Sequence, residues 1–565
     1  MNVAVWAPFA ESVELVTPER RFALRAGVSG YWQDDVDASQ LRQGYRFSID
    51  GGDPLPDPRS QWQPDGVHGS SHVIDWPESA APRAQTGVAF QAQPLRDAVM
   101  YELHVGTFTP EGTYAAAQAK LPHLVQLGVT HVELMPLATF PGRRGWGYDG
   151  VYLYAPYPGY GTPRELASFV AACHAQSLGV LLDVVYNHLG PDGNYLARYG
   201  PYFTDKYQTG WGAAFNYDGP HSDAVRRFVI DNALMWLRDY GFDGLRLDAV
   251  HAIYSFDAVH VLEELAAAVR ELGEKLGRNF VLIAESDLND PRLVRASAQG
   301  GLGLDAHWED DFHHAVHRFF TGESDGYYAD FRGLPDLAAA LRDGYVYQGQ
   351  YSPYRRRRHG RAPTGVAAHQ LVVCAQNHDQ IGNRAQGERL SMMLGVAQLK
   401  AIAALTVLSP FVPLLFQGEE WGASTPFLYF TDHEDAELGR LVAEGRSKEF
   451  SDFHWAGAVP NPQEPGTFTR SKLDWSELPR PPHAEIFEWY RQLIHLRRKK
   501  RGGAKAAVKF DADAGWLRFV HGDVLCVFNF SATAQRVPLP RGDWEPAPAG
   551  KVPGQATLIF RRRAT

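Results

Sequence analysis

An alternation of apolar strand-like segments and amphipathic helical segments occupies most of the chain, from residue 98 to about residue 500. Eight strand-like segments end near residues 105, 136, 188, 250, 286, 311, 379 and 420. In the clearest helical segment, 257–277, apolar residues recur every three or four positions: Leu262, Leu265, Val269, Leu272 and Leu276. Eight consecutive β/α units predict an α/β protein built on a closed (β/α)8 TIM barrel.

Short strand-like segments separated by polar turns flank this alternation. Residues 1–50 are typical of a small N-terminal β-sandwich, and residues beyond about 503, RVPLP (536–540) among them, predict a C-terminal β-domain. Residues 51–97 hold seven prolines and indicate a rigid connector. We therefore predict a sandwich with its Pro-rich connector at 1–90, the barrel at 91–502 and the C-terminal domain at 503–565.

One segment inside the barrel region lacks both periodicities. Residues 189–221 follow the third strand and are rich in aromatic residues: Tyr195, Tyr199, Tyr202, Tyr207, Trp211, Phe215 and Tyr217. Such an insertion between a strand and its helix predicts a lid over the barrel mouth.

Charge and composition exclude several classes of protein. The 55 Lys+Arg against 65 Asp+Glu leave a net charge of −10, so nucleic acid is not expected as a partner. The longest apolar run, 401–416, contains Pro410 and Pro413 and is too short to span a bilayer. The N-terminus lacks a secretory pattern and the three cysteines are far apart, which together favour a cytoplasmic protein outside the membrane. The run 355–358 is interpreted as a solvated basic loop.

Carboxylates recur at the predicted C-terminal ends of the strands, where barrels of this kind carry their working residues. Strand 4 ends in Arg246-Leu247-Asp248, strand 5 in Glu285 and strand 7 in His378-Asp379. Positions i and i+2 of a strand share a face, so Arg246 is expected beside Asp248 and stabilises its ionised form. Glu285 follows apolar residues, which favour a protonated acid. A helix-capping role is the alternative for each carboxylate taken alone.

Two carboxyl groups with these properties are what a retaining glycosidase requires. One ionised carboxylate attacks the anomeric carbon, and one carboxylic acid about 5 to 5.5 Å away protonates the leaving oxygen. A third acid, Asp379, is expected to orient sugar hydroxyls and to favour the positive charge that develops on the ring.

Four short motifs carry a family resemblance: DVVYNH (183–188), GFDGLRLDAVH (241–251), IAES (283–286) and QNHD (376–379). In this order and on these strands they resemble the sequence regions of the α-amylase superfamily. The resemblance implies Asp248 as nucleophile, Glu285 as general acid/base and Asp379 as transition-state stabiliser. It also implies a set of substrate-binding residues around the attacked glucose: Tyr148, His188, Arg246, Gln376, Asn377, His378 and Gln380. A structural histidine is the alternative for His188 or His378 alone.

Longer stretches narrow the resemblance within that superfamily. The chain is similar to the maltooligosyltrehalose trehalohydrolase family in PGRRGWGYDGVYLYAP (141–156), AESDLNDPR (284–292), QNHDQIGNRAQGERL (376–390), GEEWGASTPFLYFTDHEDAEL (418–438) and EGRSKEF (444–450). This resemblance implies a glycoside hydrolase that cleaves the α-1,4 bond next to the terminal trehalose of maltooligosyl trehalose. It also implies a carbohydrate-binding-like N-terminal β-domain, of the kind found in branching and debranching relatives.

The leaving-group side departs from amylases, which commonly place Lys-His after Asp-Ala. Here Val250 and His251 follow Ala249, so His251 becomes a candidate contact to trehalose. Further candidates are the loop 419–432 and a run at the end of strand 6: Asp310, Asp311, Phe312, His313 and His314. Capping and packing at the start of the following helix is the alternative for that run.

No metal or cofactor is expected. Amylases often bind calcium beside the lid, but 189–221 shows no clear cluster of Asp ligands, and no phosphate-cradling glycine loop is present. The expected partners are maltooligosyl trehalose and other α-1,4-glucan oligosaccharides. Two alternatives remain: a glucan branching or α-1,6 debranching enzyme, and a catalytically inactive barrel that binds glucan.

Overall fold

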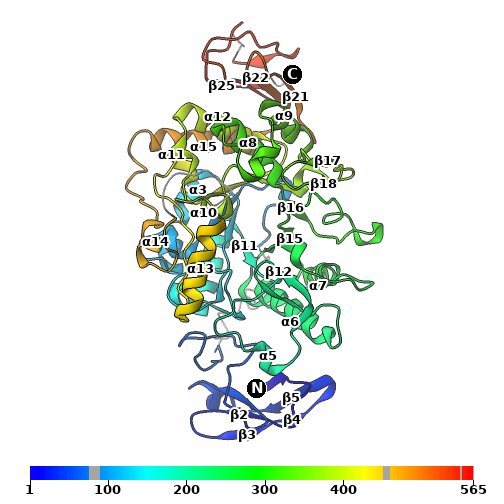
Figure 1. Cartoon of the computed structure of the whole chain (residues 1–565). Helices are drawn as coiled ribbons and strands as arrows, with labels where there is room; N and C mark the ends of the chain where they lie inside the picture. The colour runs from blue at the N-terminus through cyan, green and yellow to red at the C-terminus, as the bar shows by residue number, and fades with distance from the viewer. Residues whose placement is uncertain (75–89, 450–458, 547–549, 564–565) are drawn as a thin grey trace.

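Eight parallel strands close into a barrel at the centre of the molecule (Figure 1). The computed structural model describes residues 1–74, 90–449, 459–546 and 550–563. Strands pair in chain order and the eighth pairs with the first. They are β7 (Met100–Leu103), β8 (His131–Leu134), β11 (Gly179–Val184), β14 (Gly244–Leu247), β15 (Val281–Ala284), β16 (Ala306–Trp308), β19 (Leu371–Cys374) and β20 (Val412–Phe416). The predicted TIM barrel is confirmed.

Alternation along these strands divides the barrel interior into two layers. Apolar residues fill the lower layer, including Met100, Leu181, Ile283, Val372 and Leu414. Two residues further along, the same face carries an ionisable side chain on five of the strands: Glu102, Glu133, Asp183, Arg246 and, just after β15, Glu285. The other three strands place Trp308, Cys374 and Phe416 at this level. The floor of the barrel is therefore a packed core, and the end from which the β-to-α loops leave is chemically active.

Helices surround the barrel and bury one face each. In α4 (Pro163–Ala175) the side chains and backbone N–H groups of Thr162 and Glu165 form a reciprocal capping box. The remaining helices are α1 (Val105–Phe108), α2 (Tyr114–Gln118), α3 (Leu121–Leu127), α6 (Ser222–Met235), α7 (Val261–Leu276), α8 (Asp310–Thr321), α9 (Leu334–Asp343), α10 (His378–Gly382), α11 (Leu390–Met393), α12 (Val396–Leu408), α13 (Ala436–Glu449), α14 (Pro465–Arg470) and α15 (His483–Lys499).

Helix α7 starts later than the sequence pattern predicts. It begins at Val261 rather than at 257, and His260 caps it through a hydrogen bond from the Leu262 N–H. The residues before it belong to a loop held by Arg226, whose guanidinium donates to the Ser255 hydroxyl, the Asp257 carboxylate and the Val259 carbonyl. An irregular loop with its own polar anchor carries no helical period, so the apolar stripe alone could not give this boundary.

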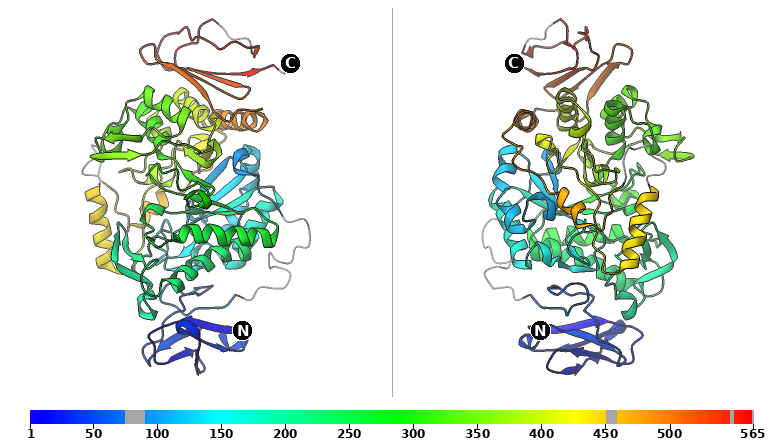
Figure 2. Two further views of the ribbon diagram at one scale, coloured as in Figure 1. Left: turned by 90° about the vertical axis from the view of Figure 1, so that its right-hand side faces the viewer. Right: turned by 60° about the vertical axis from the view of Figure 1, so that its left-hand side comes forward.

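Antiparallel sheets lie at opposite ends of the molecule, with the barrel between them (Figures 1 and 2). The N-terminal region forms two three-stranded sheets, from β1 (Asn2–Trp6), β5 (Tyr31–Asp35) and β4 (Arg25–Ala26), and from β3 (Arg21–Ala23), β2 (Val13–Val16) and β6 (Arg46–Ile49). The C-terminal sheet has the order β21 (Ala507–Asp511), β22 (Trp516–His521), β23 (Val524–Asn529), β25 (Ala556–Arg562) and β24 (Trp544–Glu545).

The C-terminal sheet differs from expectation at one strand. Residues 536–540, predicted as a strand from RVPLP, form no ladder, and Trp544–Glu545 pairs with β25 instead. Pro538 and Pro540 lack the N–H that a ladder requires, which explains the error. The domain boundaries near 90 and 502 stay predictions; part of the predicted connector, 75–89, lies outside the described residues.

Three hairpins leave the barrel on its loops. They are β9 (Ala138–Thr139) with β10 (Tyr152–Pro156), β12 (Phe203–Thr209) with β13 (Gly212–Phe215), and β17 (Gln348–Ser352) with β18 (Arg357–Gly360). The second lies in the segment predicted as a lid, after the short helix α5 (Leu196–Tyr199). Its turn presents Trp211, which is 54% exposed.

Candidate active site

The upper layer of the barrel interior is a row of ionisable side chains on successive strands. Glu102 on β7 is in register with Glu133 on β8, and Asp183 on β11 is in register with Arg246 on β14. All four are at most 2% exposed. Arg246 Nη1 donates to both Asp183 oxygens at 2.9 Å, so the buried positive charge has a partner directly beneath the mouth.

Arg246 also contacts the predicted nucleophile. Its Nη1 donates to Asp248 Oδ1 at 2.8 Å, and the Asn187 amide donates to Asp248 Oδ2 at 2.7 Å. The expectation that Arg246 and Asp248 share one face is thus confirmed. Each oxygen of Asp248 accepts a hydrogen bond, an arrangement that stabilises the ionised carboxylate and fixes its orientation.

Glu285 lies at the end of β15, beside Asp248. Burial, with the neighbouring Asp248 carboxylate, holds the pKa of Glu285 well above its usual range although Arg246 opposes the shift. The backbone N–H of Ala249 donates to Glu285 Oε2, and Ala249 adopts a left-handed φ of 39° to present it. The residue that follows Asp248 therefore positions Glu285 as well.

His378, the first residue of α10 after strand β19, couples Asp379 to the barrel interior. His378 Nδ1 bonds Glu102 Oε1 at 2.5 Å, and its Nε2 lies 2.7 Å from the Tyr148 hydroxyl and 3.4 Å from Asp379 Oδ1. Burial lowers the pKa of His378, but Asp379 and Glu102 together outweigh it and raise that pKa to about 9. The imidazolium is thus the second fixed positive charge of the site.

Solvent reaches the three predicted catalytic carboxylates. The side chain of Asp248 is 13% exposed, that of Glu285 16% and that of Asp379 37%, whereas Arg246 is fully buried. The structure therefore brings together Asp248, Glu285, Asp379, Arg246, His378 and Tyr148 at one opening of the barrel.

The run at the end of strand 6 divides into one residue at the mouth and four behind it. Asp310 is half-buried and lies within electrostatic range of Asp379 and Glu285. Burial and the carboxylates of Asp287 and Asp379 raise the pKa of Asp310 to about 7. No hydrogen bond to its carboxylate occurs within the residues that the structure describes, so its oxygens are available to a ligand.

The next four side chains of α8 are committed to packing. Asp311 Oδ2 accepts from the Asn289 amide and from the backbone N–H groups of Val346 and Tyr347. Phe312 is fully buried, His313 is 2% exposed and His314 packs on Tyr327 with ring centroids 4.5 Å apart. His313 and His314 share the helix face of Asp310 but are buried, so Asp310 is the side chain of this run that solvent reaches.

The lid contributes an aromatic ring that the strand-end argument missed. Trp211 stacks on His188, with centroids 5.6 Å apart and planes at 21°, and His188 Nδ1 bonds the Asn187 amide oxygen. His251 is exposed in the loop after Asp248. The aromatic-rich insertion 189–221 predicted a lid over the barrel mouth, but nothing in the pattern distinguished Trp211 from the six other aromatic residues.

Residues 376, 377 and 380 surround the start of α10. The Gln376 side chain accepts from the Leu390 N–H, and Asn377 caps the helix through the Gln380 N–H. Both Gln376 and Asn377 are buried, and Gln380 is half-buried. In this structure these groups position the segment that carries Asp379.

Two sequence interpretations need correction. Arg356, Arg357 and Arg358 are exposed, as interpreted, but Arg355 is not: its side chain is 14% exposed and donates to Asp287 Oδ2 at 2.9 Å, two residues after Glu285. Glu419 and Glu420 of the strand 8 loop do not face the mouth: the first accepts from the Tyr490 hydroxyl and the second from the Tyr101 hydroxyl, both at 2.9 Å. In each case the fold supplies a partner that is distant in sequence.

No group of three or more His, Cys, Asp or Glu side chains with the geometry of a metal site occurs in the described part of the chain. Among the same residues, no helix combines the length and apolarity needed to cross a membrane.

The barrel, its row of strand-end carboxylates and their arginine and histidine define a glycoside hydrolase of the α-amylase class, and the family model "Alpha amylase, catalytic domain" matches residues 78–210. The malto-oligosyltrehalose trehalohydrolases of Rhizobium sp. (strain M-11) and Arthrobacter ramosus are 50% and 49% identical to this chain, over 93% and 98% of it and 90% and 95% of their own length. The chain belongs to the malto-oligosyltrehalose trehalohydrolase family.

Solved structures agree with this assignment. A putative α-amylase from Salmonella typhimurium superposes with a TM-score of 0.90 and 38% identity, over 99% of this chain and 97% of that one. A pullulanase from Bacillus acidopullulyticus, 18% identical with a TM-score of 0.72, shares the fold. A glucan branching enzyme of Burkholderia thailandensis is 29% identical over 78% of this chain.

Proposed function

We propose that this protein hydrolyses the α-1,4 glucosidic bond next to the terminal trehalose of maltooligosyl trehalose and releases trehalose and a maltooligosaccharide. Membership of the family supports the reaction and the substrate. The observation that carries the chemistry is the pairing of Asp248, whose two carboxylate oxygens accept hydrogen bonds from Arg246 and Asn187, with Glu285, whose pKa is raised by burial.

Asp248 is assigned to nucleophilic attack. One of its oxygens forms a bond to the anomeric carbon of the attacked glucose while the bond from that carbon to the glycosidic oxygen breaks. Glu285 donates its proton to the departing oxygen, which leaves as a hydroxyl group of trehalose. In the second step Glu285 takes a proton from water, the hydroxide attacks the anomeric carbon, and Asp248 leaves as a carboxylate.

Two fixed cations and Asp379 complete the assignment. Arg246 and the His378 imidazolium lie beside the carboxylates and balance their charge without titrating near neutral pH. Asp379, the most exposed of the three, is assigned to the sugar hydroxyls and to the positive charge that develops on the ring. Tyr148 and His188 are assigned to the same glucose.

For the trehalose side we propose Asp310 and His251. Asp310 has carboxylate oxygens open to a ligand near Glu285, the acid that protonates the leaving oxygen. His251 is exposed on the loop that follows Asp248. Asp311, Phe312 and His313 are engaged in packing, so they are not carried into this assignment.

Incubation with maltotriosyl trehalose tests the proposal. We expect trehalose and maltotriose in equal amounts, with the new reducing end first released as the α-anomer, because two displacements at one carbon retain its configuration. Early-time NMR distinguishes the anomers. Release of the β-anomer would reject the retaining mechanism, and formation of α-1,6 branches would favour the branching alternative.

An inactive glucan-binding barrel is disfavoured by the same site. Binding alone requires no carboxylic acid with a raised pKa beside an ionised carboxylate, yet both are present here. A cytoplasmic location, inferred from the cysteine pattern, remains part of the proposal.

A further inference from the structure

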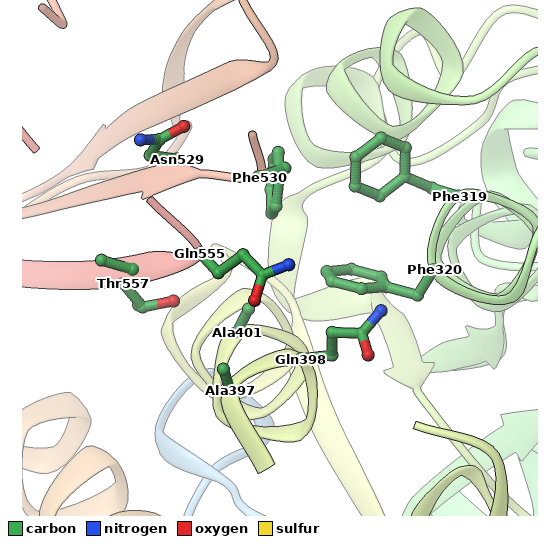
Figure 3. Close-up of a pocket in the computed structure, with 10 residues that line it drawn as sticks. Phe319, Phe320, Ala397, Gln398, Ala401, Asn529, Phe530, Gln555 and Thr557 are labelled. Carbon is green, nitrogen blue, oxygen red and sulfur yellow. The ribbon is translucent and has the colours of Figure 1, made fainter. Parts of the chain in front are cut away.

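A cavity of about 130 Å³ lies in the seam between the C-terminal sheet and the barrel (Figure 3). One wall comes from the end of α8, with Phe319 and Phe320, and a second from α12, with Gln398. The third wall comes from the sheet, with Phe530 after β23 and Gln555 before β25. The catalytic mouth lies at the other end of α8, where Asp310 is located.

Three phenyl rings contact one another at this cavity and do not cover its opening. The Phe530 ring lies 4.7 Å from Phe319 at 69° and 5.6 Å from Phe320 at 87°, measured between centroids. All three rings remain half-buried rather than buried. Edge-to-face packing leaves ring faces and edges open to solvent, surfaces that suit the C–H face of a sugar.

Amide groups border the rings. Figure 3 shows the Gln555 side chain reaching between Phe530 and Phe320, with Gln398 below. The Gln555 amide has no hydrogen-bond partner among the described residues, although its backbone N–H donates to the Ser531 carbonyl at 2.9 Å. The Gln398 side-chain oxygen accepts a hydrogen bond from the Gly395 N–H, and no described residue accepts a hydrogen bond from its NH₂ group.

The chemical character of the lining residues limits which kind of ligand the cavity can bind. All ten described residues that line the cavity are uncharged, which disfavours phosphates, carboxylates and cations. Apolar rings beside unpaired amides match a neutral molecule with one apolar face and a rim of hydroxyl groups. The cavity is smaller than the about 300 to 1000 Å³ of sites that enclose a whole ligand, so it accommodates one ring of a longer chain.

We propose that this cavity is a second glucan-binding site, which holds one glucose unit of an α-1,4-glucan chain away from the active site. The choice of an α-1,4-glucan rests on the proposed function. Phe320 lies ten residues from Asp310 on α8, about 15 Å at the rise of an α-helix. A chain retained at that distance raises the local concentration of substrate at the mouth.

Native electrophoresis in gels that contain amylopectin tests the proposal. The exposed Gln555→Ala removes an amide without disturbing packing, and Phe530→Ala removes the central ring. Gln299→Ala, at an exposed glutamine outside the cavity, is the matched control. Unfolding temperatures are measured for all variants, since Phe530→Ala also loosens the seam.

We expect wild type and Gln299→Ala to be retarded equally, and Gln555→Ala and Phe530→Ala to bind amylopectin at least about threefold more weakly. The kcat/KM of Gln555→Ala on maltotriosyl trehalose should equal that of wild type. Equal retardation of Gln555→Ala and wild type, or no retardation of wild type, overturns the inference. A chain that fails to cleave maltotriosyl trehalose refutes the proposed function through a separate assay.

Discussion

The properties of single residues in the site depend on where the charged groups around them are placed. Arg246 and His378 are buried cations whose partners, Asp183 and Glu102, lie one layer below the catalytic carboxylates. Asp248 therefore accepts hydrogen bonds from a guanidinium and an amide, whereas burial raises the pKa of Glu285 although Arg246 opposes the shift. Two carboxyl groups on adjacent strands thus acquire different roles from their surroundings.

Asp248→Asn tests the nucleophile. The amide is nearly isosteric but cannot attack the anomeric carbon, so turnover of maltotriosyl trehalose should fall by several orders of magnitude while binding persists. Steady-state rates and calorimetric binding of the substrate measure the two effects. Turnover close to that of wild type would remove Asp248 from this role.

Asp310→Asn tests the electrostatics. Asp310 is among the carboxylates that raise the pKa of Glu285, so its neutralisation should lower that pKa. Glu285 acts protonated, and the alkaline limb of kcat/KM against pH should move to lower pH by about half a unit.

Asp311→Asn is the matched control for Asp310→Asn. The Asp311 carboxylate accepts hydrogen bonds from the Asn289 amide and from two backbone N–H groups. The Asp311→Asn variant should therefore be less stable, and the alkaline limb of its kcat/KM against pH should not move. A limb that stays fixed in Asp310→Asn, or moves equally in both variants, contradicts the assignment.

At the scale of elements, periodicity predicts strands and helices but not the loops that complete the site. The residues of strand 4 and strand 5 were predictable because alternation sets which side chains share a face. The hydrogen bond of Arg355 to Asp287 was not predictable, because the two residues are 68 positions apart and only the fold brings them together. Asp310 could not be separated from Asp311 until the start and rotation of α8 were known.

The loop between Asp248 and α7 provides a prediction at this scale. Arg226 donates to the carbonyls of Tyr217 and Val259, to the Ser255 hydroxyl and to Asp257, and so ties this loop to the end of the predicted lid. Arg226→Ala should destabilise the protein by about 2 to 4 kcal/mol, since buried acceptors lose their donor.

Urea unfolding measures that loss, and limited proteolysis should show cleavage within 250–260. Arg226→Lys should recover little, because one ammonium cannot reproduce the fork of the guanidinium. The exposed Arg227 offers a matched control as Arg227→Ala. If Arg226→Ala and Arg227→Ala unfold at the same urea concentration, the loop does not depend on Arg226.

Across the whole molecule, one barrel contains the predicted catalytic residues, and two sets of antiparallel strands lie at opposite ends of the molecule (Figure 2). The eight β/α units and both flanking regions could be predicted, because each shows a local periodicity in the sequence. The seam between α8, α12 and the C-terminal sheet could not be predicted, because it joins segments that are distant in the sequence through surfaces with no periodicity of their own.

The central claim is that this barrel acts on the trehalose end of its substrate. Trehalose joins two rings through both anomeric carbons, so a site matched to it leaves polar groups unpaired when a plain maltooligosaccharide binds. The most direct measurement is kcat/KM for maltotriosyl trehalose against maltopentaose under identical conditions. We predict a ratio of at least about ten, equivalent to roughly 1.4 kcal/mol in transition-state binding. Equal values for the two substrates would contradict the account.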